Sequence, residues 1–340
     1  MSSDFKSSEP ASTDEEHAAD PRYVVALDVG GTSMKGGLVT RCGEVTSLEG
    51  RPTGRDSGPE TVVTAVRGYV DELVELGVTR YGAPPAGVGL AVPGIVTAST
   101  AVYSANIGWH DVPATAFVPP GIPARLGHDV RTGGLAESVL GAGRGVTDFL
   151  FLAIGTGIAG AVVIGGEPYG GADGCGGEIG HAPVWPAGEK CACGQIGCLE
   201  TYASASALVR RYEARSPSRT AATAKDVVSL AVAGDPVAGE VFGEAVEALA
   251  ISLASYVMVL DPAAIVIGGG LAEAGETLLD PLGERLSARL TFRQRPPLLV
   301  AALGMRTGML GAALLGWQAA GVPDAGRDWS LDVLRRGAVS

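Results

Sequence analysis

The stretch that organises this chain runs from residue 178 to residue 200, and it reads Glu178-Ile-Gly-His181, a connecting segment, then Cys191-Ala-Cys193-Gly-Gln-Ile-Gly-Cys198-Leu-Glu200. One histidine and three cysteines form the ligand set of a closed tetrahedral zinc site. A small loop that binds a metal through thiolates needs little hydrophobic core of its own. We therefore predict a structural zinc ion bound by His181, Cys191, Cys193 and Cys198.

Two other interpretations of these cysteines stay open at this point, a disulfide pair or unreactive buried thiols. Cys191 and Cys193 are too close in sequence to pair with each other easily, and three cysteines leave one over. The carboxylates of Glu178 and Glu200 bracket the cluster. We interpret the metal as a structural element that turns these carboxylates and His181 toward a polar ligand.

The composition predicts a two-domain α/β protein. The 340 residues suffice for two domains of ordinary size, and 46% of them are hydrophobic but only 5% aromatic. A core of Ala, Val, Leu and Ile suits parallel or mixed strands covered by helices. The net charge of −12 argues against a nucleic-acid or membrane-surface partner. It does not exclude an anionic substrate, which local dipoles can hold.

The cysteine count and the terminal segments favour a cytoplasmic protein. Beyond the cluster, Cys42 and Cys175 are left as free thiols, which suits a reducing compartment. Met1–Asp20 has no apolar run, so we expect a disordered segment rather than a signal peptide. The apolar run Ala248–Leu260 is too short to span a bilayer and predicts a buried helix.

A first glycine-rich turn follows the β-rich run Tyr23–Leu27. The turn reads Asp28-Val-Gly30-Gly31-Thr32-Ser-Met-Lys35, Gly36–Thr40 continues as a strand, and a third strand is expected over 45–52. A dinucleotide-binding fingerprint would need a helix here, so we predict a hairpin. Its bare N–H groups and the Thr32 hydroxyl could hold phosphate, and Asp28 could hold Mg²⁺ through water. An ordinary glycine hairpin is the alternative.

A second hairpin repeats the first. The strand Asp148–Ile154 turns at Gly155-Thr156-Gly157 and continues as Ile158–Ile164. A strand–Gly-Thr–strand unit in each half of a chain predicts an internally duplicated fold. Two such hairpins facing each other across a cleft would hold one polyphosphate from both sides.

Two further positions carry polar side chains next to strands or turns. Ala124–Gly127 predicts a short strand that leads into His128-Asp129 and then a helix over 132–140. An aspartate at such a junction is either an N-cap or a catalytic base at the carboxyl end of a strand. Asn106 lies three residues before Trp109 and could bind a sugar hydroxyl, although a turn residue beside a partly buried tryptophan fits equally.

The remaining chain predicts helices and one more glycine turn. Helices are expected over 59–76, 205–214, 224–233 (with a capping box of Thr223 and Asp226), 236–260 and 308–320. The strand 264–267 opens into Gly268-Gly269-Gly270 and a helix over 271–279, where bare backbone could receive an adenine or ribose. A plain helix entry is the alternative. Residues beyond Val322 form a tail or a packing extension.

Together these motifs resemble the ROK family of sugar kinases over about 23–320. The resemblance implies an α/β, two-domain actin/hexokinase-type (ribonuclease H-like) ATPase fold with an interdomain cleft. The expected divisions are a disordered tail (1–21), a small domain (22–128, joined by the helix 306–320), a large domain (129–305, with the metal loop 178–200) and a tail (321–340). The family also includes repressors with an added N-terminal helix-turn-helix, for which we expect no room here.

The resemblance also implies roles for particular residues. Asp129 is the expected general base, and the expected sugar ligands are Asn106, His128, Glu178, His181 and Glu200. The expected ATP ligands are Asp28, Gly30, Gly31, Thr32, Lys35, Gly155, Thr156, Gly157, Gly268, Gly269 and Gly270. The cofactors would be ATP, Mg²⁺ and structural Zn²⁺, and the assembly a homodimer or homotetramer.

One departure from the family pattern concerns the sugar. The family usually has Asn-Asp followed by small residues at the catalytic position, whereas this chain has His128-Asp129-Val-Arg131. Histidine can also donate a hydrogen bond, but its ring is larger and its charge depends on pH. We expect an ATP-dependent glucokinase acting on the 6-hydroxyl. The alternatives are a kinase for N-acetylmannosamine or another hexose, or a sugar-sensing protein with weak catalysis.

Overall fold

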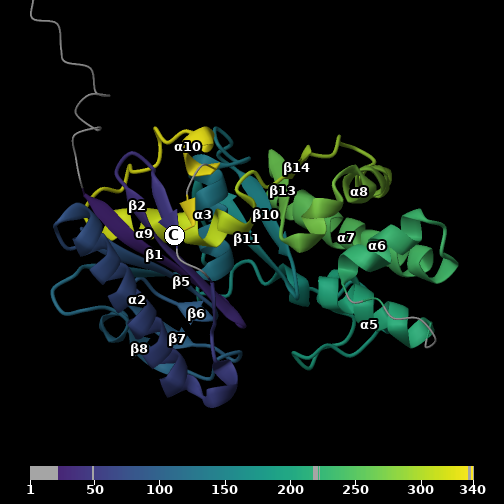
Figure 1. Ribbon diagram of the computed structural model, residues 1–340. Helices are drawn as coiled ribbons and strands as arrows, with labels where there is room; N and C mark the ends of the chain where they lie inside the picture. The colour runs from purple at the N-terminus through teal and green to yellow at the C-terminus, as the bar shows by residue number, and fades with distance from the viewer. Residues whose placement is uncertain (1–21, 48–49, 217–220, 222, 336–337, 340) are drawn as a thin grey trace, which may run out of the picture.

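The computed structural model describes residues 22–47, 50–216, 221, 223–335 and 338–339. The expected disordered segment 1–21 lies outside these residues. Two sheets form the framework, one built from strands between residues 23 and 128, with a short C-terminal strand added, and one from strands between residues 149 and 300 (Figure 1). A small antiparallel sheet of β6 (Ile95–Val96), β7 (Thr100–Tyr103) and β8 (His110–Pro113) flanks the first.

The two sheets share one strand pattern, which confirms the predicted duplication. The first has the order β15-β3-β2-β1-β5-β9, with β4 also paired to β2, and the second has the order β12-β11-β10-β13-β14. In each, an antiparallel hairpin is followed by two strands parallel to its first strand. The strands of the first sheet are β1 (Tyr23–Val29), β2 (Ser33–Thr40), β3 (Val45–Ser47), β4 (Arg51–Pro52), β5 (Gly87–Val92), β9 (Ala124–His128) and β15 (Ala338–Val339). Those of the second are β10 (Phe149–Ile154), β11 (Ile158–Ile164), β12 (Glu167–Pro168), β13 (Ala264–Gly268) and β14 (Leu298–Val300).

Two helices lie between the sheets and join them. α3 (Asp129–Leu140) packs against β11 and against α9 (Thr307–Ala319), and α9 packs against β1 and β5. The approach of α9 is close, because a Cβ on Gly89 would lie 1.8 Å from the carbonyl oxygen of Ala312. Both helices begin at the sheet edge where the parallel strands end, and this places their N-termini at the candidate site.

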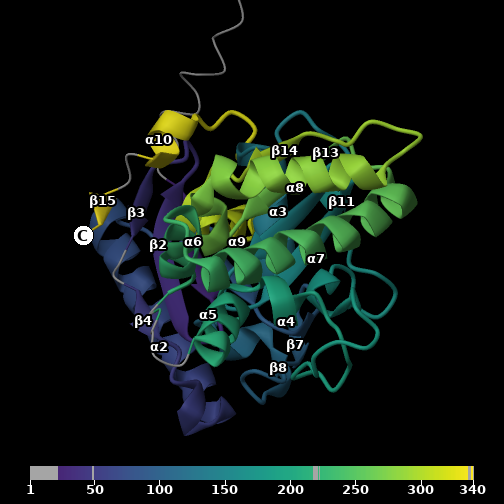
Figure 2. The ribbon, with the colours of Figure 1, turned by 90° about the vertical axis from the view of Figure 1, so that its right-hand side faces the viewer.

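The outer faces are covered by other helices. α2 (Pro59–Tyr81) packs on the first sheet and buries its apolar face in a core with β1 and β5. The second sheet is covered by the layer that Figure 2 shows in front. This layer comprises α4 (Glu200–Ala203), α5 (Ala205–Arg215), α6 (Ala224–Val232), α7 (Pro236–Leu260) and α8 (Glu276–Arg289). The predicted capping box of Thr223 and Asp226 is present at the start of α6.

α7 is long and apolar enough to cross a bilayer by length and composition alone. Its residues Val241, Leu249 and Leu253 are instead buried in the core between the second sheet and the neighbouring helices. That packing is typical of the central helix of a globular domain.

Two segments differ from the sequence predictions. The helix expected over 271–279 is a 3-10 helix, η4 (Gly270–Ala274), followed by α8, because Gly275 interrupts the helical backbone at φ 54° and ψ −130°. The strand expected over 45–52 is divided into β3 and β4, with residues 48–49 outside the described part.

The segment after Val322 is a packing extension, one of its two predicted forms. It carries α10 (Leu331–Arg335), and the side chains of Ala325, Trp329 and Leu334 are buried in the core around α9. The indole nitrogen of Trp329 donates to the carbonyl oxygen of Arg41 at 2.9 Å. The C-terminal segment therefore packs against the first sheet.

Candidate active site

Asp28 and the His128–Asp129 junction lie at one edge of the first sheet. The parallel registers pair Asp28 with Ala91, Ala91 with Gly127, and Val92 with His128. These residues therefore sit at the carboxyl ends of β1, β5 and β9. In open α/β sheets this edge is where ligands bind.

The Asp28 carboxylate is packed against the beginning of α9. A Cβ on Gly308 would lie 2.3 Å from Asp28 Oδ2, so only glycine leaves room for the carboxylate there. Burial raises the pKa of Asp28 to about 6, and the charge of Lys35, its cross-strand partner, acts in the lowering direction. Asp28 is thus a largely desolvated acid at a helix N-terminus, where negative charge is favoured.

Both predicted glycine hairpins are confirmed. The first turn closes with a hydrogen bond from Gly30 N–H to Ser33 O at 2.9 Å, and the second with one from Gly155 N–H to Gly157 O, also at 2.9 Å. The outer sides of both turns are open. A Cβ on Gly155 would meet nothing within 4 Å, and one on Gly31 would meet only Arg55 Nη1, at 4.0 Å.

Glu200 contacts the second turn. Its Oε2 accepts a hydrogen bond from the backbone N–H of Ile158 at 2.8 Å. A Cβ on Gly157 would lie 2.4 Å from the same oxygen. Of the two carboxylates that bracket the cysteines, Glu200 therefore ties the loop to the second hairpin.

His128, and not Asp129, is the N-cap of α3. His128 Nδ1 accepts from Arg131 N–H at 3.4 Å, while Asp129 is the first helical residue and its Oδ1 accepts from Val130 N–H at 2.7 Å. The imidazole is buried, with 8% of its side chain exposed. Nδ1 also lies 3.2 Å from Asp129 Oδ1. With Nδ1 as the acceptor of the Arg131 N–H, the proton of the neutral ring is assigned to Nε2.

Asp129 is placed where its carboxylate is poorly solvated. Burial raises its pKa to about 7, the hydrogen bond from Val130 lowers it, the negative charges of Asp28 and Glu178 raise it further, and the positive charge of Arg131 lowers it. Its side chain remains 29% exposed and therefore accessible. A carboxyl group with a pKa near neutrality is suited to accept a proton during a reaction.

A gap suited to a hydroxyl group separates His128 from Glu178. The distance between His128 Nε2 and Glu178 Oε1 is 3.9 Å, too long for a direct hydrogen bond. Burial, followed by the charge of Arg131, lowers the pKa of His128 to about 3, so the ring is neutral and Nε2–H is a donor. The pair thus offers one donor and one acceptor to a group between them.

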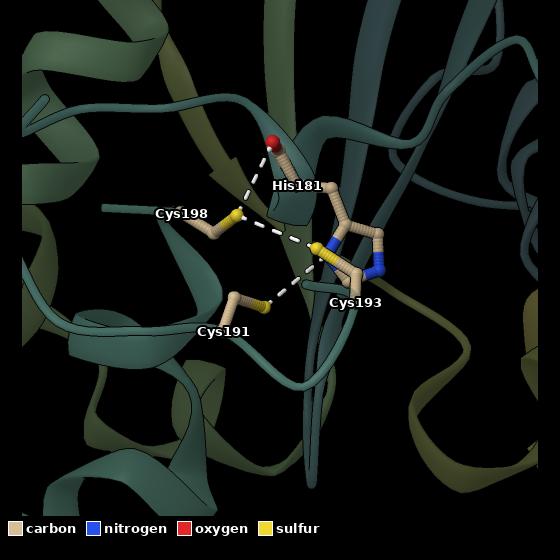
Figure 3. Close-up of side chains that lie close together, drawn as sticks. All are labelled: His181, Cys191, Cys193 and Cys198. Atoms are coloured by element: carbon tan, nitrogen blue, oxygen red, sulfur yellow. Dashed lines mark hydrogen bonds between the residues drawn. The ribbon is translucent and has the colours of Figure 1, made fainter. Parts of the chain in front are cut away.

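The four predicted metal ligands come together (Figure 3). Their donor atoms all lie within 4.8 Å of one another, with Cys193 Sγ 3.7 Å from Cys198 Sγ, and Cys191 Sγ 3.7 Å from His181 Nδ1. All five cysteines of the chain are free, which excludes the disulfide alternative in this structure. His181 turns Nδ1 toward the cysteines, so its Nε2 is available to another partner.

The loop that carries the cysteines is also anchored without a metal. Glu189 forms ion pairs with Arg210 and Arg211, and Arg211 is itself buried and paired with Glu244 of α7. The hydroxyl of Tyr202 accepts from Glu189 N–H at 2.5 Å. These contacts attach the loop to α5 and α7.

The glycines at 268–270 end β13 and open η4. Gly269 has φ 79° and a Cβ there would lie 2.4 Å from Ile154 O, so this position needs glycine. Gly270 lines a cavity of about 340 Å³ between α6 and η4, together with Val228, Leu271 and Thr277. The cavity is large enough for a flat heterocyclic ring.

The described contacts do not join Asn106 to the other predicted sugar ligands. It is exposed in the turn that follows β7. Its neighbour Trp109 is buried and packs edge-on against Phe117 with ring centroids 5.7 Å apart. The described contacts give Trp109 a structural role and do not link Asn106 to Asp129.

A family model described as ROK family matches residues 24–319. The chain belongs to the ROK family. The glucokinase of Halalkalibacterium halodurans is 34% identical to it over 87% of this chain and 94% of the relative.

Two solved ROK structures share the fold. The glucokinase of Streptomyces griseus, in complex with glucose and AMPPNP, is 30% identical and superposes with a TM-score of 0.74, covering 87% of this chain and 99% of that one. The ROK hexokinase of Thermus thermophilus is 35% identical with a TM-score of 0.73, covering 87% and 98%. The expected actin/hexokinase-type α/β fold is thereby confirmed.

Two residues near the candidate site make contacts that the sequence did not indicate. Thr53 clamps the first turn, since its N–H donates to Thr32 O at 3.0 Å and its hydroxyl to Gly30 O at 2.8 Å. Arg131 is buried and holds a segment next to Glu178, as described below. These contacts join residues that are far apart in sequence, so no local sequence pattern predicts them.

Proposed function

We propose that this protein is an ATP-dependent hexose kinase that phosphorylates glucose at its 6-hydroxyl. The observation that carries the proposal is the placement of Asp129: an accessible carboxyl group with a pKa near 7, beside the His128–Glu178 pair. It lies at the same sheet edge as Asp28. The similarity to glucokinases over most of the chain supports the same function.

The hexose would bind through its hydroxyl groups. A hydroxyl oxygen between His128 and Glu178 can accept from Nε2–H and donate to the carboxylate, because two hydrogen bonds of about 2.8 Å can bridge the 3.9 Å gap. His181 would offer Nε2 to another hydroxyl, and Glu200 its second oxygen. Asn106 stays a predicted ligand that would have to approach when the sugar is bound.

ATP would extend from the glycine turns to the cavity near Gly270. The exposed turns at Gly30–Gly31 and Gly155–Gly157 suit phosphate oxygens, through the N–H groups of Gly31 and Gly157, which lie outside the turn-closing hydrogen bonds, and the hydroxyls of Thr32 and Thr156. Asp28, with Lys35 opposite, would hold Mg²⁺, which supplies positive charge to the phosphates. The adenine or ribose would occupy the 340 Å³ cavity that Gly270 lines, past Gly268 and Gly269.

Asp129 would act as the general base of the transfer. The hexose hydroxyl oxygen forms a bond to the γ-phosphorus, the bond from that phosphorus to the β–γ bridging oxygen breaks, and ADP leaves. The hydroxyl proton passes to the Asp129 carboxylate. A base with a pKa of about 7 is ionised often enough to act and basic enough to accept this proton.

The chemistry of the four clustered donors fits a structural zinc ion. For a Zn–S bond of about 2.3 Å, the edge of a tetrahedron measures about 3.8 Å. The 3.7 Å separations in the cluster are close to this value. His181, Cys191, Cys193 and Cys198 would hold the ion, which would fix the loop between Glu178 and Glu200.

The zinc proposal has a separate test. Metal analysis of the purified protein should find about one zinc per chain, and Cys193→Ser should lower that content and weaken glucose binding. Glucose affinity that stays at the wild-type level in a metal-free Cys193→Ser protein would show that the cluster is not needed for the sugar site.

A second candidate is a sugar-binding protein with weak catalysis, favoured by His128 and Arg131 at positions where the family usually has other residues. The presence of Asp28, Thr32, Asp129 and Thr156 argues against it. A cytoplasmic location and a homodimer or homotetramer are further parts of the proposal. Light scattering tests the assembly.

Initial rates of ADP release separate the candidates. Glucose, mannose, fructose and N-acetylmannosamine are compared at saturating Mg·ATP, with Asp129→Asn as the inactive control. We expect glucose to give the highest kcat/KM and Asp129→Asn to lose about 10³-fold in kcat while binding glucose. Sugar binding without ADP release by the wild type would favour the sensor, and near-normal turnover by Asp129→Asn would refute the assigned base.

A further inference from the structure

We infer that Arg131 is a positioning residue of the sugar site, holding the glycine-rich segment 170–177 with its side chain and the ring of His128 with its backbone. The inference rests on the proposed function, because it explains how that site is kept in shape. Arg131 is in the first turn of α3, two residues after Asp129. It therefore connects the expected base to the segment that leads into Glu178.

The side chain of Arg131 is a buried cation bonded to backbone. Only 9% of the residue is exposed, and Nη1 donates to Gly174 O at 2.8 Å and to Gly176 O at 3.2 Å. Hydrogen bonds from a charged donor in a desolvated place are among the stronger ones. Losing the guanidinium would leave both carbonyl groups without that partner.

The segment 170–177 has little conformational preference of its own. Gly171, Gly174 and Gly177 adopt positive φ angles of 77°, 77° and 97°. Glycine residues lose more conformational freedom on ordering than any other residue, so such a segment needs external contacts. It has one at its end, where Gly160 N–H donates to Gly177 O at 2.8 Å. Arg131 supplies the contacts at Gly174 and Gly176.

The backbone of Arg131 sets which nitrogen of His128 faces the sugar. Its N–H donates to Nδ1, and this directs the ring proton to Nε2, the atom 3.9 Å from Glu178 Oε1. The groups that face the imidazole are Asp129 and Arg131 of α3 and Glu178 of the loop. The positive charge of Arg131 also disfavours protonation of the ring, so Nε2–H stays part of a neutral donor.

Arg131 should therefore control hexose affinity more than the chemical step. The Arg131 side chain supports the segment that leads into Glu178, and its charge disfavours protonation of His128. The backbone N–H that contacts His128 is retained in any variant at this position, and the Asp129 carboxylate is held by Val130 N–H. In Arg131→Met the glucose KM should rise roughly 10- to 100-fold, the size expected for lost hydrogen bonds of a charged group. Because the Arg131 charge also lowers the pKa of Asp129, the comparison is made at pH 8, above that pKa. There the kcat at saturating glucose should fall less than about threefold, and the ATP KM should be unchanged.

The test compares Arg131→Met and Arg131→Lys with Arg125→Met, an exposed arginine of β9. Lysine keeps the charge and one donor nitrogen, without the planar guanidinium, and should recover part of the glucose affinity. Arg125→Met should match the wild type. Hydrogen exchange of the peptide spanning 170–178 should be faster in Arg131→Met. These results would support the inference.

Three outcomes would overturn it. They are a wild-type glucose KM in Arg131→Met, equal losses in kcat and in both KM values, and unchanged exchange of the 170–178 peptide. If Arg131→Met does not fold, Arg131→Lys carries the test, and a wild-type glucose KM together with wild-type exchange in that variant contradicts the inference. A wild-type protein that phosphorylates none of the hexoses would instead refute the proposed function.

Discussion

The two hairpins of this protein share a backbone but differ in the carboxylate beside the turn. In the strand registers, Asp28 of β1 corresponds to Ala153 of β10, since each is the last residue paired with the neighbouring parallel strand. Ala153 is apolar and packs against the core of Phe149 and Phe151, whereas Asp28 is a carboxylate that lies against the beginning of α9. The second turn receives its carboxylate from Glu200, which lies just beyond the metal-ligand cluster.

This difference shows how a duplicated scaffold becomes an asymmetric site. Both halves present open glycine turns, and either turn suits a phosphate group. Only the first half supplies an acid from its own strand, next to Asp129. The second half supplies an acid from an inserted loop, and the same loop begins at Glu178. The duplicated strands thus place the two turns, and the carboxylates Asp28 and Glu200, which are not repeated, make the two turns different.

The largest expected effect comes from exchanging the strand-end residue in each half. Asp28→Asn should lower kcat/KM for Mg·ATP by about 100-fold or more, because the carboxylate expected to hold Mg²⁺ is lost. Ala153→Gly, at the corresponding position, should lower thermal stability, by about 1 kcal/mol of unfolding free energy, and leave the ATP kinetics unchanged. ADP-release kinetics and thermal melts measure both. Equal effects of the two variants on the ATP kinetics would remove the proposed asymmetry.

The pH profile should show the next largest effect. The fold raises the pKa values of Asp129 and Asp28 to about 7 and about 6, and both must be ionised to act. The kcat/KM for glucose should therefore fall about tenfold as pH drops from 7 to 6, more steeply below 6, and level off above 7.

The raised pKa of Asp129 also makes the stability of the fold depend on pH. A raised carboxyl pKa means that the fold holds the proton more tightly than the unfolded chain does, so stability decreases as pH rises from about 4 to about 7. Asp129→Asn removes this cost. Its melting temperature should exceed that of the wild type at pH 8 and approach it at pH 4. A flat activity profile between pH 6 and 8 would contradict the assignment of Asp129.

The smallest effect concerns Glu200, the carboxylate that the loop supplies to the second turn. Gly157→Ala would place a Cβ 2.4 Å from Glu200 Oε2 and displace that side chain from the second turn. Gly155→Ala, where a Cβ meets nothing within 4 Å, is the matched control for protein packing. We expect Gly157→Ala to raise the glucose KM a few-fold, with Gly155→Ala acting on the ATP KM instead. A change in the ATP KM alone for both variants would separate Glu200 from the sugar site.

Those features that depend on short stretches of sequence were predictable. The hairpins, the metal-ligand cluster and the capping box of α6 each involve residues close together in the chain. The carboxyl-end placement of Asp129 followed from a strand leading into a helix. These are local or topological patterns, and the structure reproduces them.

The electrostatic setting of Asp129 was not predictable, since it depends on residues from three distant segments. Asp28 and Glu178 raise its pKa only because β1, β9 and the loop before η3 (Ile179–His181) converge. The sequence also gave no sign that His128 rather than Asp129 caps α3, because both side chains can accept from a helix N-terminus. The break at Gly275 was equally hidden, since glycine is tolerated within helical patterns.

Hydrogen exchange of the wild-type protein with glucose, and separately with a non-hydrolysable ATP analogue and Mg²⁺, tests the account most directly. Glucose should slow exchange in peptides covering 129–132 and 176–181, and the nucleotide in peptides covering 30–33, 155–158 and 268–272. Protection of the loop 176–181 by the nucleotide alone, or by neither ligand, would contradict the claim that this loop and Asp129 form one sugar site.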